Sequence, residues 1–368
     1  MEAAGARLRV IVFATAIVGG AASPPFTSAQ NTQAPISLQE APSGARRYQF
    51  LTDHRLVGSA YNSLFVWDCQ TSRRTTLQSG GKNETLVCSP DGRYLVCGRK
   101  VFAAPELKLL QQLTLAEDDP PIVESAAFSR DGSLLAFGLN HGRIVVVETK
   151  SWNVVHRLAG PSAKLIGIWV AFGETSNQLL ACWGLHQANM LITSHDLATG
   201  ATQSLSATTR GGRPHIGEPF SLPVKRACGD IFLVGDTPQF AMSPTHKNFA
   251  LAVRTSDGRG ALGVWDARTL LPHWIADLGP GDVLGVAFSP DEKFLTIGGY
   301  STEERVATEV PLRVINAATG ELALTLPRTQ ETATTGIAFS PDGKTVALSR
   351  LNAPIELLSW KSIEEKLR

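Results

Sequence analysis

One five-residue cluster recurs along this chain and constrains its fold more than any other feature. The copies read Cys88-Ser-Pro-Asp-Gly92, Phe128-Ser-Arg-Asp-Gly132, Phe288-Ser-Pro-Asp-Glu292 and Phe339-Ser-Pro-Asp-Gly343, with a weaker copy at Met242-Ser-Pro-Thr245. Ser-Pro-Asp-Gly is a tight-turn sequence, because Pro fixes φ at the second position, Asp caps the turn locally and Gly takes the left-handed conformation. Each copy separates two apolar runs, and recurrence at roughly forty to fifty residues is typical of a β-propeller.

Further strand signals lie at fixed distances from each turn. The second strand is apolar and ends near Gly, as in Leu134-Leu-Ala-Phe-Gly138, and the third strand runs into an acidic or polar residue, as in Ile144-Val-Val-Val-Glu148. Turn residues such as Ala318-Thr-Gly320 then precede a fourth strand, here Leu322–Leu326. Four short strands per unit make one blade, so the sequence predicts an all-β fold of four-stranded antiparallel blades.

The number of units predicts a seven-bladed β-propeller. The units begin near Tyr48, Thr85, Val123, Leu165, Gln239, Val283 and Thr335. The seventh unit has three clear strands, and its fourth is expected from Ile36–Gln39, which removes the exposed sheet edges of an open array. The stretch from Leu205 to Gln239 is long for a loop, and an eight-bladed ring is the alternative.

Two of these units resemble the WD40 family. The segments Val57-Gly-Ser-Ala-Tyr-Asn-Ser-Leu-Phe-Val-Trp-Asp68 and Phe137-Gly-Leu-Asn-His-Gly-Arg-Ile-Val-Val-Val-Glu148 both fit that family's second strand, turn and third strand without a gap. The resemblance covers nearly all of residues 46–360. The terminal Trp-Asp pair is present only at 67–68 and 265–266, and the family's Gly-His pair is absent. The chain is therefore similar to a divergent WD40-like propeller whose blades rely on apolar packing.

Residues 1–29 are predicted to be a signal peptide. Arg7 and Arg9 form a short positive start, an apolar, Ala-rich stretch of thirteen residues follows at Val10–Ala22, and a cleavage site is expected after Ala29. The apolar stretch is short for a membrane span, and a retained anchor and an organelle transit peptide are the alternatives. The expected layout continues with a linker and closing strand at 30–45, the propeller at 46–360 and a polar tail at 361–368. The mature protein is expected to be periplasmic or secreted, with no stable membrane span.

Export makes the five cysteines informative. Cys88 and Cys97 lie on the two strands of one hairpin, where they form either a disulfide or part of the core, since sister units carry Phe or Met at the position of Cys88. Cys69, Cys182 and Cys228 are isolated, and the odd count leaves at least one thiol unpaired within the chain. Neither the cysteines nor the histidines have metal-like spacing, so no metal and no cofactor are expected.

Charge argues against one class of partner. Hydrophobic residues make up 43% of the chain and charged residues 18%, which suits a sheet protein with a large core. The formal net charge is +1, and removal of residues 1–29, with two arginines and one glutamate, brings it to zero. A nucleic-acid partner is not expected, because phosphate neutralisation needs a basic surface.

Strand direction alternates within a blade, so its connections fall on two different ends. Turns between first and second strands and between third and fourth strands share what we call the tight-turn end. Connections between second and third strands and between blades share the loop-rich end, which carries the longest segments, Ala207–Pro238 and Tyr300–Val310. Insertions gathered on one face commonly build the binding face of a repeat protein.

The loop-rich end supplies the candidate binding residues. They are Arg210, Arg213, His215, Lys225, Arg226, His141, His186 and Glu303. The basic group at 210–226 suits a carboxylate or a phosphate, since Arg binds such groups bidentately; the alternative is an ordinary solvated loop surface.

Catalytic motifs are missing from the sequence. There is no Gly-x-Ser-x-Gly and no Gly-rich phosphate loop in a strand–loop–helix setting. His195-Asp196 ends a third strand where sister units carry Trp-Asp, which indicates a repeat variant rather than a catalytic pair. Trp265-Asp-Ala-Arg-Thr-Leu-Leu-Pro-His-Trp274 resembles the signature of quinoprotein dehydrogenase propellers, with Leu270 in place of Gly, and is interpreted as turn chemistry.

The first strands are expected to line the central channel with small or apolar residues. Those residues are Ala126, Ala127, Val170, Ala241, Val286, Ile337 and Ala338. An enzyme needs several polar side chains that converge there. The sequence therefore predicts a non-catalytic scaffold, a monomer or a subunit of a complex, that binds a protein or peptide. The alternative is a propeller enzyme, either a lactonase-like hydrolase or a quinoprotein-like oxidoreductase, with its site at the channel.

Overall fold

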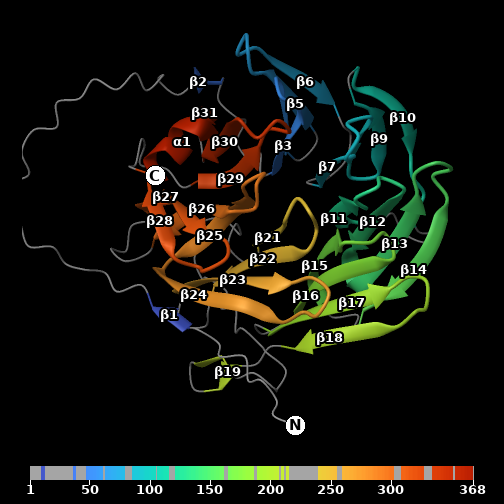
Figure 1. Ribbon diagram of the computed structural model, residues 1–368. Helices are drawn as coiled ribbons and strands as arrows, with labels where there is room; N and C mark the ends of the chain where they lie inside the picture. The colour runs from blue at the N-terminus through green and yellow to red at the C-terminus, as the bar shows by residue number, and fades with distance from the viewer. Residues whose placement is uncertain are drawn as a thin grey trace, which may run out of the picture.

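The computed structural model of the chain describes residues 10–12, 36–38, 47–60, 63–78, 85–104, 106–115, 121–160, 165–185, 189–206, 209–210, 213–214, 239–254, 259–301, 308–326, 334–350 and 353–367. They form seven blades of four antiparallel strands around one axis (Figure 1). The predicted seven-bladed β-propeller is confirmed, and the eight-bladed alternative is wrong.

The strands of blades 1 to 6 follow one another from the axis outward in chain order, and in blade 7 the N-terminal β2 is the outer strand. Blade 1 comprises β3 (Arg47–Thr52), β4 (Arg55–Ala60), β5 (Ser63–Asp68) and β6 (Arg74–Gln78). Blade 2 comprises β7 (Leu86–Cys88), β8 (Tyr94–Cys97), β9 (Lys100–Ala103) and β10 (Lys108–Gln112). Blade 3 comprises β11 (Val123–Phe128), β12 (Leu134–Leu139), β13 (Arg143–Glu148) and β14 (Val154–Ala159). Blades 4 and 5 comprise β15 (Leu165–Phe172), β16 (Gln178–Leu185), β17 (Asn189–Asp196) and β18 (Thr202–Ser206); and β21 (Gln239–Met242), β22 (Asn248–Arg254), β23 (Arg259–Asp266) and β24 (Pro272–Pro280). Blades 6 and 7 comprise β25 (Asp282–Phe288), β26 (Phe294–Ser301), β27 (Thr308–Asn316) and β28 (Leu322–Thr325); and β29 (Thr334–Phe339), β30 (Thr345–Arg350), β31 (Glu356–Ser359) and β2 (Ile36–Ser37).

The ring closes through the N-terminal strand β2, as predicted. Ile36 lies opposite Leu357 of β31, and the amide of Leu38 donates to the carbonyl oxygen of Ile355 over 2.8 Å. Leu38 is 1% exposed and packs in the core shared by blades 7 and 1. Burial of this side chain therefore holds the two ends of the chain in one sheet.

Three elements lie outside the blade pattern. β1 (Val10–Val12) adds to blade 5 parallel to β24, and β19 (Thr209–Arg210) pairs with β20 (Arg213–Pro214) as a short ribbon. Helix α1 (Trp360–Leu367) occupies the stretch expected to be a polar tail. Its apolar residues fall at helical spacing, so Trp360 and Ile363 bury against blades 6 and 7.

One hydrogen-bond network holds the recurring turn. In blade 3 the buried Ser129 hydroxyl donates to Asp131 Oδ1 over 2.6 Å and accepts from the amide of Leu134 over 2.9 Å. Asp131 also accepts from the amide of Ser133 over 3.0 Å. The same serine–aspartate bond recurs in three sister turns, at Ser89, Ser289 and Ser340. Each of these four turns is thus closed by its own side chains.

Two copies of the turn depart from the pattern and bond to each other. Thr245 stands where sister turns have Asp, and Glu292 stands where they have Gly, with the left-handed φ of 60° retained. The Glu292 carboxylate accepts from the amide of Thr245 and, over 2.9 Å, from its hydroxyl. These bonds link blade 5 to blade 6 at the tight-turn end.

His195 belongs to a buried polar chain within blade 4, consistent with its interpretation as a repeat variant. Trp183 Nε1 donates to Thr193 Oγ1 over 2.7 Å, and that hydroxyl lies 2.8 Å from His195 Nε2. His195 Nδ1 lies 3.0 Å from the hydroxyl of Thr202. The Thr193 oxygen accepts from the indole, and the tautomer of His195 sets the direction of its bonds to Thr193 and Thr202. Burial lowers the pKa of His195.

The cysteines of blade 2 are free thiols in the core rather than a disulfide. Cys88 pairs with Leu95 across the hairpin and Cys97 pairs with Leu86, so the two cysteines are diagonal neighbours. Diagonal partners lie about 7–8 Å apart, which exceeds the reach of a disulfide. Burial raises the pKa of Cys88 to about 12.

Candidate functional site

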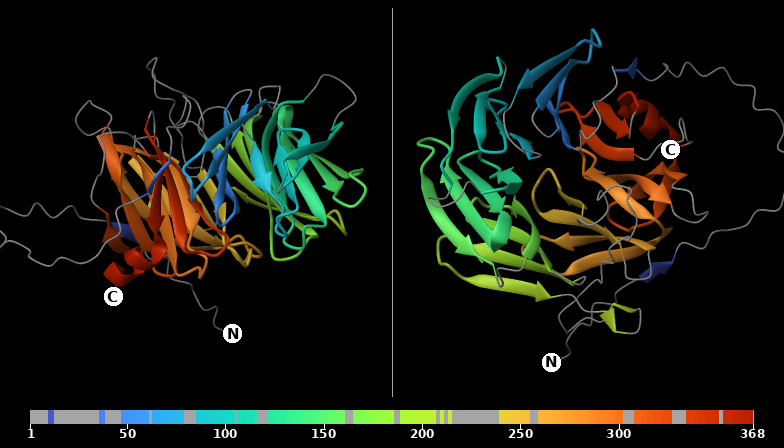
Figure 2. Two further views of the ribbon diagram at one scale, coloured as in Figure 1. Left: turned by 90° about the horizontal axis from the view of Figure 1, so that it is seen from above. Right: turned by 180° about the vertical axis from the view of Figure 1, so that it is seen from behind.

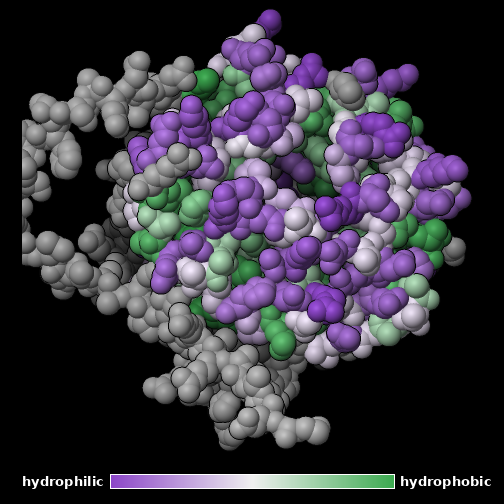
Figure 3. All heavy atoms as spheres, in the orientation of Figure 1, coloured by the Kyte–Doolittle hydropathy of each residue, from purple (hydrophilic) through white to green (hydrophobic). Residues whose placement is uncertain are grey.

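Three carboxylates at the tight-turn end form ion pairs within their own turns. Asp91, Asp291 and Asp342 each form an ion pair with the Arg or Lys two residues later. The face that carries these turns is covered mostly by hydrophilic residues (Figure 3). Figure 2 shows the disc edge-on and from behind, with this end and α1 on one side and the loop-rich end on the other. The candidate binding residues belong to the other, loop-rich end.

The structure places three of the candidate binding residues. His141 is exposed in the 3-10 turn η1 (Asn140–Gly142) between β12 and β13, with φ of 60°, and this connection lies at the loop-rich end. Arg210 and Arg213 face each other across the β19–β20 ribbon. His215, Lys225, Arg226, His186 and Glu303 lie outside the described residues.

Two inner strands meet through a cation–π contact across the centre of the ring. The guanidinium carbon of Arg47, on β3, lies 5.8 Å from the centroid of the Trp169 ring, on β15. Blades 1 and 4 lie on opposite sides of the axis in Figure 1, so this contact spans the centre. A guanidinium over an indole is worth about 0.5–2 kcal/mol, depending on its exposure.

Glu124 lies on the neighbouring inner strand, β11. Its Oε2 accepts from the amide of Ile168 over 2.8 Å, and the next residue, Ser125, donates to the Ile168 carbonyl oxygen over 2.6 Å. These bonds fix β11 against β15. Burial raises the pKa of Glu124 to about 7, although the hydrogen bond from Ile168 opposes this rise. Near neutral pH this carboxyl group therefore exchanges a proton readily.

Arg47, Glu124 and Trp169 correct the expectation that the first strands carry only small or apolar residues. Sequence reasoning missed them because Arg47 and Glu124 precede the apolar part of their strands. The long β15–β16 hairpin, with eight residues in each strand, also obscures the repeat position of Trp169. Charge in the first two residues of an inner strand is the signal that locates this group.

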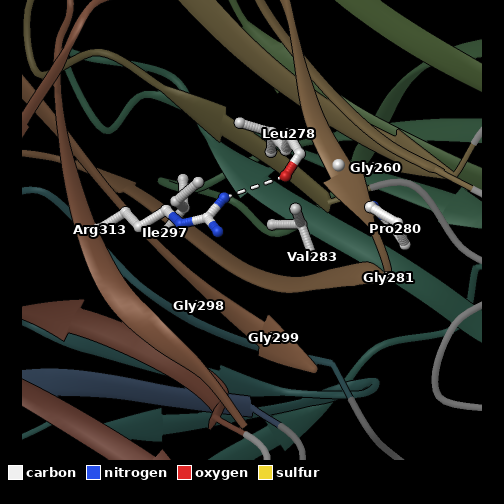
Figure 4. A pocket seen from close by; sticks show the side chains of 10 residues that line it. Gly260, Leu278, Pro280, Gly281, Val283, Ile297, Gly298, Gly299 and Arg313 are labelled. Atoms are coloured by element: carbon white, nitrogen blue, oxygen red, sulfur yellow. Dashed lines mark hydrogen bonds between the residues drawn. The ribbon is translucent and has the colours of Figure 1, made fainter. Parts of the chain in front are cut away.

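A glycine-lined notch opens between blades 5 and 6 (Figure 4). Its glycines come from β23, from β24, from the connection between the blades and from β26, and they are Gly260, Gly279, Gly281, Gly298 and Gly299. Leu278, Val283 and Ile297 supply apolar walls. Most of these positions lie toward the loop-rich ends of their strands, where the β23–β24 and β26–β27 pairings shift register.

Arg313 is the one charged side chain among the residues that line the notch. It extends from β27 toward blade 5, where its Nη1 donates to the carbonyl oxygen of Leu278 over 3.0 Å (Figure 4). Register aligns Arg313 with Phe65, Val145 and Gly263 of sister third strands, so a charge replaces an apolar or small residue. That departure from the repeat pattern can be read from the sequence, and it distinguishes position 313 from its counterparts in the sister blades.

A buried ion pair fixes the loop-rich end of blade 7. Arg350 Nη2 lies 3.1 Å from Glu356 Oε2, and the two side chains are 4% and 8% exposed. Glu356 also lies opposite Ser37 of the closing strand. Breaking such a pair is costly because it leaves a charge buried, so it holds the seam at which the ring closes.

Two kinds of feature are absent from the described residues. No three His, Cys, Asp or Glu side chains of this part of the chain are grouped so that they hold a metal ion. Within the same ranges, no helix has the length and apolar character needed to cross a membrane.

Comparison with known proteins identifies the fold. No protein-family profile and no curated protein sequence matches the chain. A solved structure titled Structure of U3-55K is similar with a TM-score of 0.64 and 12% sequence identity, covering 88% of this chain and 97% of that chain. A chain from the Crystal Structure of Mitotic Checkpoint Complex is similar with a TM-score of 0.62 and 14% identity, covering 94% and 98%. Likeness at identities this low establishes a shared fold alone.

Proposed function

We propose that this propeller is a non-catalytic scaffold that binds a protein or peptide at its loop-rich end, in a periplasmic or extracellular compartment. One observation carries the proposal, namely the different build of the two ends. Tight-turn carboxylates are paired within their turns, whereas the loop-rich end carries a glycine-lined notch with Arg313 at its wall. Arginine and tryptophan are the residues most enriched at binding hot spots, and loops on a rigid frame commonly carry recognition.

The fold supports this role by analogy. A propeller of the same architecture was solved as part of the mitotic checkpoint complex. The candidate loop residues, including His141, Arg210 and Arg213, belong to the proposed surface. A partner is expected to contact them together with the rim of the notch.

Capture of partners tests the proposal. The exported fraction is passed over the intact protein, over Arg210→Ala/Arg213→Ala, and over a variant shortened between Ala207 and Asp236. The variants are expected to lose partners without a lower melting temperature. Lys293→Ala, at an exposed tight-turn position, is the matched control and is expected to recover the full set. Equal recovery by the intact and shortened proteins contradicts the use of the insertion.

The compartment rests on residues 1–29 and has its own test. Export predicts a mature protein that begins at Gln30, found outside the cytoplasm by fractionation and by mass spectrometry of its N-terminus. Cleavage also removes β1, which pairs with the outer strand β24 in the full chain. A cytoplasmic protein that retains Met1 refutes the compartment and leaves the scaffold proposal untouched.

Catalysis at the centre of the ring is the second candidate, and Glu124 is the observation that favours it. A carboxyl group with a pKa of about 7 suits general acid–base chemistry near neutral pH. Hydrolysis of a panel of lactones and a dye-linked dehydrogenase assay distinguish the two. Turnover by the native protein that Glu124→Gln abolishes supports an enzyme, and equal background rates support the scaffold.

A further inference from the structure

The outer strand of blade 5 already holds a fifth strand. β1 runs parallel to β24, with residues 10–12 opposite residues 275–277, so blade 5 is a five-stranded sheet (Figures 1 and 2). Among the described residues, every other blade has four strands. The outer edge of β24 therefore pairs with a segment that does not belong to the repeat.

The sequence of β24 leaves this edge open to pairing. β24 has nine residues, whereas the outer strands of the other blades have between two and six. Its prolines, Pro272 and Pro280, stand at the two ends, so every position between them has a backbone N–H. Natural edge strands are commonly blunted by short length, by lysine or by proline. The middle of β24, Trp274-Ile275-Ala276, has none of these features.

Both faces of β24 adjoin an apolar core. Trp274 and Ala276 pack in the core shared by blades 5 and 6, and Ile275 packs against the core shared by blades 4 and 5. A strand added beside them extends both apolar layers, because successive side chains of a strand point to opposite faces. The edge therefore suits an unbroken apolar run rather than an alternating one, and Val10-Ile11-Val12 is such a run.

The direction of the added strand follows from the blade. β24 begins after the tight turn that is closed by the bond from the amide of Asp266 to the carbonyl oxygen of Leu271, and it ends at the loop-rich end. A strand parallel to β24 therefore enters at the tight-turn end and leaves toward the loop-rich end.

We propose that the outer edge of β24 binds an extended, apolar segment of a protein partner as a fifth, parallel strand of blade 5. Val10–Val12 covers this edge in the full chain, and loss of residues 1–29 opens it. Main-chain hydrogen bonds supply the affinity in this mode of binding. The inference goes beyond the proposed function because the site lies on the rim of the disc (Figure 1), and it shares with that function only the cleavage after Ala29.

A chain that is cut after folding tests the edge. The full-length protein, with a protease site inserted after Ala29, is folded whole, cut, and freed of residues 1–29 by gel filtration. The probe is a fluorescent peptide with the sequence of residues 7–14, Arg-Leu-Arg-Val-Ile-Val-Phe-Ala. By anisotropy, the probe is expected to bind the cut protein about tenfold or more tighter than the uncut chain, in which the tethered β1 competes for the same edge.

Hydrogen exchange locates the bound probe. Residues 272–280 are expected to exchange faster after the cut and to regain protection when the probe is added, since an unpaired edge leaves amides open to water. The outer strands β14 and β18 serve as internal references and should not change. Protection by the probe at any segment other than β24 overturns the proposal.

Two proline peptides separate a backbone ladder from apolar adhesion, and they leave the protein unchanged. One carries proline in place of Val10 and the other in place of Ile11. Because successive N–H groups of a strand point to opposite sides, only one of the two peptides loses a donor to β24. That peptide is expected to bind about tenfold weaker than its matched control, and equal affinities of the two overturn the proposal.

A pair of protein variants tests the same edge from the other side. Ile275→Lys places a charge at the middle of β24 and is expected to weaken the probe about tenfold, as lysine does at natural edges. Leu322→Lys, at a 43% exposed position of the outer strand of blade 6, is the control and should bind the probe as the native protein does. An unchanged melting temperature shows that each variant is folded.

The remaining outcomes distinguish this edge from the loop-rich end. Arg210→Ala/Arg213→Ala should bind the probe normally, so probe binding without captured partners upholds the edge and contradicts the loop-rich surface. Normal capture without probe binding overturns the edge alone. Dimers of the cut protein that protect β24 in ultracentrifugation and exchange experiments would assign the edge to a second copy instead. A chain that keeps Met1 in the cell leaves the edge covered and overturns partner binding there.

Discussion

The serine of the recurring turn is expected to contribute more stability than its exposed neighbour on the same carboxylate. Ser129 is fully buried, and its hydroxyl makes two hydrogen bonds, at 2.6 Å to Asp131 and at 2.9 Å from the amide of Leu134. Ser129→Ala removes a bond to a charged group and leaves an amide without its acceptor. Each loss costs about 1–3 kcal/mol, and because both involve one hydroxyl they do not add in full, so we expect the free energy of unfolding to fall by about 2–4 kcal/mol.

Ser133 provides a matched control. Its hydroxyl donates to the same Asp131 oxygen over 2.8 Å, but at an exposed position where water can replace it. Ser133→Ala is therefore expected to change the free energy of unfolding by less than about 0.5 kcal/mol.

Urea denaturation followed by tryptophan fluorescence measures both variants, with equal m-values as the sign that the comparison is valid. For 368 residues and about 2.1 cal/mol/K of unfolding entropy per residue, the loss at Ser129 corresponds to a melting temperature lower by about 3–5 °C. Alanine at Ser89, Ser289 or Ser340 should cost a similar amount. Equal losses for Ser129→Ala and Ser133→Ala would refute the reasoning, because they would show that the buried hydroxyl is not the centre of the network.

Three other outcomes are expected. Burial lowers the pKa of His195 in the folded state, so its contribution to stability is full above the unfolded pKa of about 6.5 and is lost as the pH falls below that value. The free energies of unfolding at pH 7 and pH 5 should therefore differ less in His195→Gln than in the native protein. His54→Gln, at an exposed position, is the control and should keep the native difference. Leu38→Ala should destabilise the ring by about 2–4 kcal/mol in urea, and Ile36→Ala, at a 52% exposed position of the same strand, by far less; equal losses would contradict closure through Leu38. Trp274→Phe removes the 2.8 Å bond from its indole to a blade 6 carbonyl and should cost about 1–3 kcal/mol by calorimetry; an unchanged melting temperature would show that water replaces the bond.

Local chemistry explains why the sequence predicted the architecture well. Pro, Asp and Gly fix the backbone conformation within four residues, so the turns at 88–92 and 339–343 can be predicted directly from the sequence. The apolar runs on either side form the strands. The closing strand at Ile36 was predictable for a related reason. A blade with three strands needs a fourth, and the segment before blade 1 is the nearest one that can supply it.

Contacts across the ring could not be predicted in the same way. Arg47 and Trp169 are far apart in sequence, and they meet only because seven blades close into a circle. The register between Cys88 and Cys97 similarly depends on which residues of the hairpin face each other. Arg313 is different, since a charge among apolar third-strand residues was readable, but its direction toward Leu278 depends on the packing of blade 5 against blade 6.

The paired exceptions at Thr245 and Glu292 have a consequence for how this sequence can change. Glu292→Gly alone relieves the left-handed backbone but removes the carboxylate to which Thr245 donates. Thr245→Asp alone places two carboxylates next to each other. Changes at 245 and 292 are therefore expected to be coupled, so that the double substitution costs less stability than the two single ones together. The turns of two neighbouring blades act as one stabilising unit at that seam.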